Sequence, residues 1–288
     1  MKLAICLYGN IGIAQAASQR QDNVNLLKES EIANTDPAIC YEAIKKLFID
    51  KYDTDIFIHT WSINHRSVLE DIYKPKSSTF EKQIEFNFPL SKYGINESNT
   101  IEDWEVSSIA KESYNLLLAS RENIETVVKE LKNLVFRTQS RWYSTKKVVE
   151  LMSDYSKKKN IKYDFVLLTR FDCLYKKTIE LNKLDNSNFY ASFRKGRVDE
   201  DFAVYDFFFL SNKKNIEIFS KLYDEIYNYS IRPPFASMEH AINNFGKRNI
   251  KHLLEHREDY DKVRSNSLNY KPNYIFKIKN KLKKILSI

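Results

Sequence analysis

The sequence predicts an α/β fold with a mostly parallel, Rossmann-type sheet that is flanked by helices. Three short apolar runs carry this prediction, at residues 3–8, 55–61 and 163–172. Runs that are apolar on both faces are typical of strands buried on both sides of a parallel sheet. A helical stripe of apolar residues over 38–52 separates the first two runs, which predicts a strand, helix and strand unit with a right-handed crossover.

The rest of the chain is organised around the third apolar run. Its apolar part, 165–168, is followed by two charged residues, Arg170 and Asp172. Ligands of open α/β sheets bind outside the carboxyl ends of the strands, so this pair is well placed to meet one. An ordinary salt bridge at the end of the strand is the alternative, because charged residues often cap strands.

The composition is that of a globular chain of 288 residues, with 43% hydrophobic and 29% charged side chains. This length suits one large α/β domain or two small ones. The net charge of +8 favours nucleic acid, anionic lipid or a polyphosphate ligand as partner. Cys6, Cys40 and Cys173 form no metal-ligand spacing and no disulfide framework, which predicts a reducing compartment.

The first predicted strand ends in a loop that contains Gly9 and Gly12. Glycines let backbone N–H groups approach a phosphate or a nucleotide closely. The loop matches neither the GxGxxG motif nor the P-loop, so the glycines alone do not define a site. Further along, residues 80–88 predict a short additional strand.

Two helices are predicted ahead of the third apolar run, over 107–134 and 138–159. The beginning of the second, residues 137–147, is dense in cations, hydroxyl groups and aromatic rings. A helix N-terminus attracts anions through its dipole, and nearby cations add to that attraction. A solvated basic face is the alternative, and we favour it for Lys147.

The second half of the chain predicts strands over 188–193 and 204–210, and a helix over 215–229 that ends at Pro233 and Pro234. Asp206 is embedded in the second of these strands, and a buried acid needs a partner or a function.

Glu239 falls in the first turn of the next predicted helix, which opens at Ser237. A carboxylate in that position either matches the helix dipole or points from a loop into a site. His252 and His256 are four residues apart but lack the HExxH pattern, so no metal role is predicted for them.

The tail of the chain differs from the rest in composition, which predicts a domain over 1–265 and a basic amphipathic segment over 266–288. Within the tail, apolar residues lie at helical spacing and lysines fill the other face; the apolar residues are Ile275, Ile278, Leu282 and Ile285. Such a helix suits an anionic lipid surface. A helix docked on the domain is the alternative.

Four short blocks resemble the bacterial glycosyltransferase-like proteins of capsule and lipopolysaccharide gene clusters. The blocks are residues 1–9, 55–61, 163–172 and 206–209. They are scattered over most of residues 1–250. The resemblance implies a GT-A-type fold, a nucleotide-sugar donor and a cytoplasmic protein that is peripheral at the inner face of the cytoplasmic membrane.

Enzymes with the GT-A fold hold a divalent metal, Mn²⁺ or Mg²⁺, on the donor diphosphate with a D-x-D motif. Here the matching residues are Arg170, Phe171 and Asp172, so Asp172 fits the second acid and Arg170 replaces the first. A guanidinium group can itself neutralise a diphosphate. The resemblance therefore leaves two sources of charge compensation, a divalent metal bound by Asp172 or fixed cations.

The resemblance predicts a glycosyltransferase that moves a sugar from a nucleotide donor to a capsular polysaccharide, a lipopolysaccharide or a lipid-linked glycan. Asp172 would lie at the diphosphate. If the enzyme inverts configuration, Asp206 or Glu239 would be the base that takes the proton of the acceptor hydroxyl; the sequence does not choose between inversion and retention. The predicted donor-binding residues are Tyr8, Gly9, Asn10, Thr60, Trp61, Arg137, Arg141, Lys146, Arg170 and Asp172.

Two other functions fit the same residues. One is a transferase that moves a phosphoryl-type group onto a surface polysaccharide, and the other is a non-catalytic, membrane-attached assembly protein. Nucleic acid is not an expected partner, because the basic residues gather in the tail and near one helix start without an RNA-binding motif.

The tail generates the first testable prediction. Deleting residues 274–288 should release the protein from anionic vesicles, because each lysine near an anionic surface contributes ~1 kcal/mol. Salt should weaken the binding of the full-length protein without abolishing it, since the apolar stripe also inserts. Sedimentation with vesicles measures both effects. Full-length protein that stays in the supernatant at low salt, or a deletion that unfolds the domain, would make the tail a docked structural helix.

Overall fold

The computed structural model describes residues 1–11, 37–86, 89–95, 115, 124–193 and 204–262. The predicted tail and most of the predicted helix over 107–134 lie outside these residues. Within the described part, no helix is both long and apolar enough to cross a membrane.

A central sheet of seven strands has the order β3-β2-β1-β4-β7-β6-β8. Its strands are β1 (Lys2–Tyr8), β2 (Asp53–Thr60), β3 (Ser77–Phe80), β4 (Phe165–Arg170), β6 (Phe189–Phe193), β7 (Tyr205–Ser211) and β8 (Ile250–Glu255). Neighbours from β3 to β4 are parallel, β7 is antiparallel to both of its neighbours, and β6 is parallel to β8. Six strands therefore run in one direction, which confirms the predicted mostly parallel α/β fold.

Because β7 runs the other way, its first residues lie at the same edge as the carboxyl ends of the other six strands. A second, two-stranded sheet stands beside this edge and pairs β5 (Cys173–Tyr175) with β9 (Tyr260–Lys262). The sequence patterns predicted neither β8 nor β9.

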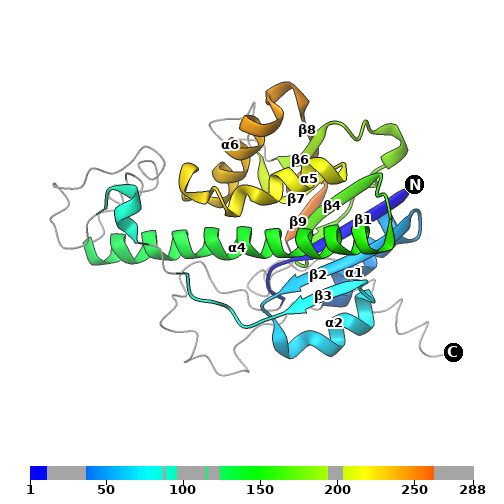
Figure 1. Cartoon of the computed structure of the whole chain (residues 1–288), viewed down its shortest axis with the longest axis horizontal. Coiled ribbons are helices and arrows are strands. Elements are labelled where there is room, and N and C mark those ends of the chain that lie inside the picture. Colours follow the sequence, from blue (N-terminus) through cyan, green and yellow to red (C-terminus); the bar gives the residue numbers. More distant parts are fainter. Residues whose placement is uncertain (12–36, 87–88, 96–114, 116–123, 194–203, 263–288) are drawn as a thin grey trace.

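The two faces of the sheet are covered by different helices (Figure 1). Alternate residues of β1 divide between two cores, with Leu3, Ile5 and Leu7 in one and Ala4, Cys6 and Tyr8 in the other. The first core contains residues of α1 (Pro37–Ile44), of the following π-helical turn (Lys45–Ile49) and of α2 (Arg66–Tyr73). The second contains residues of α4 (Ile124–Lys159), α5 (Lys213–Ser220) and α6 (Pro233–Phe245). This arrangement explains why the central strands are apolar on both faces.

Three predicted boundaries were wrong. Helix α4 is continuous over 36 residues, so residues 137–147 lie in its interior and the predicted anion site at a helix N-terminus does not exist. Pro233 and Pro234 occupy the first turn of α6, where proline is tolerated, and so they begin a helix instead of ending one. β3 ends at Phe80, where the prediction placed its beginning.

The direction of α4 places its middle at the carboxyl edge of the sheet. The helix leads through a short connection into β4 and runs back along the sheet, and its first half extends beyond the strands (Figure 1). β4 has six residues and is about 20 Å long at ~3.3 Å per residue. Lys159 and Arg141 are about 27 Å apart along the helix at ~1.5 Å per residue. Arg141 therefore lies just past the end of β4.

Candidate functional site

Two ion pairs lie side by side at the carboxyl edge of the sheet. Arg141, from the middle of α4, pairs with Asp206 at the start of β7. Arg170, the last residue of β4, forms a fork with Asp172, in which Nε donates to Oδ1 at 2.7 Å and Nη2 donates to Oδ2 at 2.5 Å. Both carboxylates are buried, and both guanidinium groups are about 15% exposed. The fold thus brings together four predicted site residues that are up to 65 positions apart in the sequence.

The ring of Phe207 lies beneath this cluster. The guanidinium carbons of Arg141 and Arg170 are 5.4 and 4.9 Å from its centroid. The Nζ of Lys262 is 4.7 Å from the same centroid. Lys262 reaches this place because β9 pairs with β5, where it lies opposite Cys173. The negative face of one aromatic ring therefore attracts three cations.

The arginines affect one another electrostatically. Burial and the neighbouring Arg170 lower the pKa of Arg141 to about 9. The pKa of Arg137 is also lowered, first by desolvation and then by Arg170, although its side chain is exposed at the surface. Burial opposes the charge of Arg170 too, but the carboxylate of Asp172 outweighs it and raises the pKa. All three guanidinium groups are charged at neutral pH.

The three guanidinium groups and the two carboxylates together carry a net charge of +1. Lys262 adds a further positive charge beside the ring of Phe207. Converging like charges cost free energy in a partly desolvated place, and such costs are typical of functional sites. A polyvalent anion would relieve the repulsion. The arrangement is therefore suited to bind a group such as a diphosphate.

The acids of this cluster do not fit a divalent metal. Both oxygens of Asp172 accept hydrogen bonds from Arg170, and Asp206 is paired with Arg141. Over the described ranges, no three His, Cys, Asp or Glu side chains are grouped so that they could hold a metal ion. The predicted metal ligand Asp172 instead orients a guanidinium group.

Other predicted donor-binding residues lie at the ends of β1 and β2, and they differ in burial. Tyr8 is buried, and its hydroxyl donates to the backbone carbonyl of Asp206 at 3.2 Å. Asn10 is exposed in the loop after Gly9. Thr60 and Trp61 are buried at the end of β2.

Two predicted residues make their contacts elsewhere. Lys146 contacts Asp224 at 2.6 Å and Glu150 at 3.8 Å, on the side of α4 that faces the turn after α5. Glu239, in α6, accepts a hydrogen bond from the backbone N–H of Ser230 at 2.8 Å. Their roles in a site remain predictions.

Lys262 is the residue of the cluster that the predictions missed. It belongs to a three-residue strand, and it approaches Phe207 only through the long-range pairing of β9 with β5. An alternation of apolar and polar residues cannot be recognised over so short a strand.

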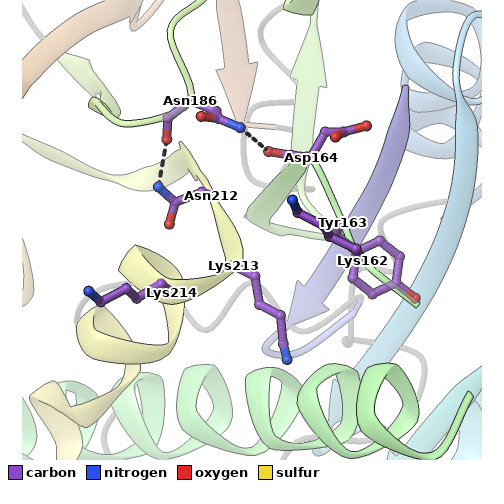
Figure 2. A pocket seen from close by; sticks show the side chains of 7 residues that line it. All are labelled: Lys162, Tyr163, Asp164, Asn186, Asn212, Lys213 and Lys214. Carbon is purple, nitrogen blue, oxygen red and sulfur yellow. Dashed lines mark hydrogen bonds between the residues drawn. The ribbon is translucent and has the colours of Figure 1, made fainter. Parts of the chain in front are cut away.

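A cavity of about 300 Å³ lies at the opposite edge of the sheet, near the beginning of β4 (Figure 2). Asn186 connects two of its walls, because its side chain donates to the carbonyl of Asp164 and its own carbonyl accepts from Asn212. Lys162 and Lys214, which also line the cavity, are exposed. The cavity contains none of the predicted site residues, and its surface lysines do not form a buried charged site, so the arginine cluster is the stronger candidate.

The chain matches no family model and no curated protein. Among solved structures, it is similar to the crystal structure of a "putative nucleotide-diphospho-sugar transferase" from Desulfovibrio desulfuricans G20, with 8% sequence identity and a TM-score of 0.38. The match covers 94% of this chain and 86% of the other. A likeness this remote leaves the function to be argued from the geometry of the site.

The burial of the Arg141–Asp206 pair can be tested through stability. Arg141→Ala should lower the free energy of unfolding by about 3–5 kcal/mol, because it leaves Asp206 buried without its counter-ion. The exposed Arg137 is the matched control, and Arg137→Ala should change stability by no more than about 0.5 kcal/mol. Urea denaturation measures both. Equal, small effects would show that the pair is solvated.

Proposed function

We propose that the protein is a glycosyltransferase that takes a sugar from a nucleoside diphosphate donor and passes it to a glycan or lipid-linked acceptor, as in capsule or lipopolysaccharide assembly. One observation carries the proposal: Arg141 and Arg170 lie against the same ring, Phe207, at the carboxyl edge of a mostly parallel sheet, with Arg137 one helical turn before Arg141. The leaving group of such a donor is a diphosphate, and fixed cations stabilise the charge that develops on it. The remote structural likeness is not part of this argument.

In the proposed reaction, an acceptor hydroxyl oxygen bonds to the anomeric carbon while the bond from that carbon to the diphosphate oxygen breaks. The nucleoside diphosphate leaves with the bonding electrons, and Arg141 and Arg170 balance its charge. A base takes the hydroxyl proton if the reaction inverts configuration. Asp206 and Glu239 are the alternatives for this base, and of the two Asp206 is the one that belongs to the arginine cluster.

Binding of the nucleotide tests the site. Wild-type protein should bind a nucleoside diphosphate in the presence of EDTA, because the arginines supply the counter-charge. Arg170→Ala should weaken that binding by ~1.5–3 kcal/mol, the range for a hydrogen bond to a charged group. Lys147→Ala is the matched control, since Lys147 contacts Glu150 on α4, and it should leave the affinity unchanged. Calorimetry after a thermal-shift screen of nucleotides gives these values.

The same titration can contradict the proposal. Wild-type protein that binds no nucleoside diphosphate, with or without Mn²⁺, would remove the donor site. Binding that depends entirely on Mn²⁺ would mean that a metal supplies the charge compensation in place of the arginines.

Turnover separates the alternative functions. Asp172→Asn should nearly abolish release of nucleoside diphosphate from a nucleotide sugar, because it weakens the fork that orients Arg170, and the variant should stay folded. A phosphoryl-type transferase would release nucleoside monophosphate instead. A non-catalytic assembly protein would show no donor turnover, and its other functions would tolerate Asp172→Ala. Chromatography of the nucleotide products distinguishes these outcomes.

A further inference from the structure

A second polar group lies beside the arginine cluster and contains residues that have no assigned role. His59, near the end of β2, contacts Ser144 of α4 through Nδ1 and Glu81 after β3 through Nε2, each at 2.7 Å. The backbone N–H of Gly9, just after β1, donates to Ser144 Oγ at 3.1 Å. Three neighbouring strand ends and one helix are therefore joined by a single chain of hydrogen bonds.

The direction of every hydrogen bond in this chain follows from the chemistry of its groups. The carboxylate of Glu81 can only accept, so Nε2 of His59 carries the proton and donates to it. In the neutral ring Nδ1 is then an acceptor, so the hydroxyl of Ser144 donates to Nδ1 and its oxygen accepts from Gly9. Burial lowers the pKa of His59, with Glu81 acting in the opposite direction, which keeps the ring neutral at pH 7.

Serine, histidine and an acid also form nucleophilic triads, but these three do not fit that chemistry. Ser144 and His59 are fully buried, and the serine oxygen already accepts from Gly9. Trp61 and Tyr143 cover the imidazole, with their ring centroids 5.0 and 5.8 Å from it. A substrate cannot reach the hydroxyl, so the chain fixes the backbone and performs no covalent step.

The backbone that it fixes is the described part of the loop after β1, residues 9–11, here called the Gly9 loop. Gly9 has a φ of +99°, a value that glycine tolerates and other residues rarely adopt. Its N–H also donates to the carbonyl of His59 at 3.2 Å. The preceding residue, Tyr8, donates to the carbonyl of Asp206, so the loop begins directly at the arginine cluster.

We propose that His59, Ser144 and Glu81 are positioning residues that hold the Gly9 loop in the conformation that receives the nucleotide of the donor. This inference rests on the proposed function and adds to it. It assigns to three polar residues the task of preorganising a backbone that touches the ligand, so that the loop does not have to be ordered on binding.

The test compares variants that break the chain with one that keeps it. Ser144→Ala removes one of the two acceptors of the Gly9 N–H and leaves only the carbonyl of His59, and Glu81→Leu removes the acceptor for Nε2 of His59. Glu81→Gln keeps an amide oxygen that accepts from Nε2, so it preserves the direction of every hydrogen bond. Glu81 is about one third exposed, so both of its variants should fold. Val68→Ala, at an exposed position of α2, is the control for stability.

Two quantities are measured for each variant, the exchange rate of the Gly9 amide and the affinity for a nucleotide. Hydrogen exchange of the amide of Gly9 should be roughly 2- to 12-fold faster in Ser144→Ala and Glu81→Leu, which corresponds to the loss of one hydrogen bond. Affinity for the nucleoside diphosphate that the wild type binds best, tested with UDP and GDP, should fall by a similar factor. Glu81→Gln and Val68→Ala should change neither quantity.

The results separate this inference from the proposed function. A wild type that binds neither UDP nor GDP overturns both. If the wild type and Ser144→Ala bind a nucleotide equally well, the positioning role alone is overturned. It is also overturned if the exchange of the Gly9 amide is the same in both proteins. A Glu81→Gln variant as impaired as Glu81→Leu also overturns it, because the carboxylate charge and not the hydrogen-bond chain would then be the requirement.

Discussion

The buried ion pair between Arg141 and Asp206 is the interaction on which the geometry of the site depends. Taking two charges out of water costs several kcal/mol per ion, so the pair persists only if the packing around it fixes both partners. Trp142, the neighbour of Arg141 in the sequence, supplies that packing, since it is fully buried against Phe209 and Phe219. The indole ring fixes the rotation of α4, and this rotation directs the guanidinium group of Arg141 to β7.

The same packing makes the cluster electrostatically expensive. Arg141 and Arg170 both lie against the ring of Phe207, and burial together with the charge of Arg170 lowers the pKa of Arg141. The free protein carries this cost permanently, whereas a bound anion would cancel part of it. A ligand that binds only the native state raises the apparent stability, so a site of this kind couples anion binding to the stability of the fold.

Local patterns predicted the strands well but the long helix poorly, and the reason lies in what α4 packs against. Apolar residues identified β1, β2 and β4 because a strand buried on both faces needs no information from the rest of the chain. In α4, the buried stripe changes partners. Val127 and Leu131 pack in a small separate core, whereas Trp142 and Met152 pack against the sheet. Between the two cores the buried positions are polar, at Thr138 and Gln139. The apolar periodicity is interrupted there, and so the prediction divided one helix into two.

Arg170, Asp172 and Asp206 were recognisable because each follows or interrupts an apolar strand, whereas Arg137 and Arg141 were recognisable only as part of a cation-rich stretch. Their pairing was not recognisable, because it joins elements far apart in the sequence. Lys262 was not recognisable at all, because its strand β9 and the partner strand β5 are too short to show a pattern of apolar and polar residues.

The arginine at position 170 determines what Asp172 does at this strand end. Two acids at this strand end would repel each other and attract a cation, whereas an arginine and an acid two residues apart form a fork that satisfies both. The carboxylate then holds a guanidinium group in one orientation. Charge compensation of this kind is fixed by the covalent chain and by the packing of Phe207, so its geometry does not depend on an exchangeable ion. The paired acids therefore fix the orientation of both guanidinium groups at the carboxyl edge of the sheet.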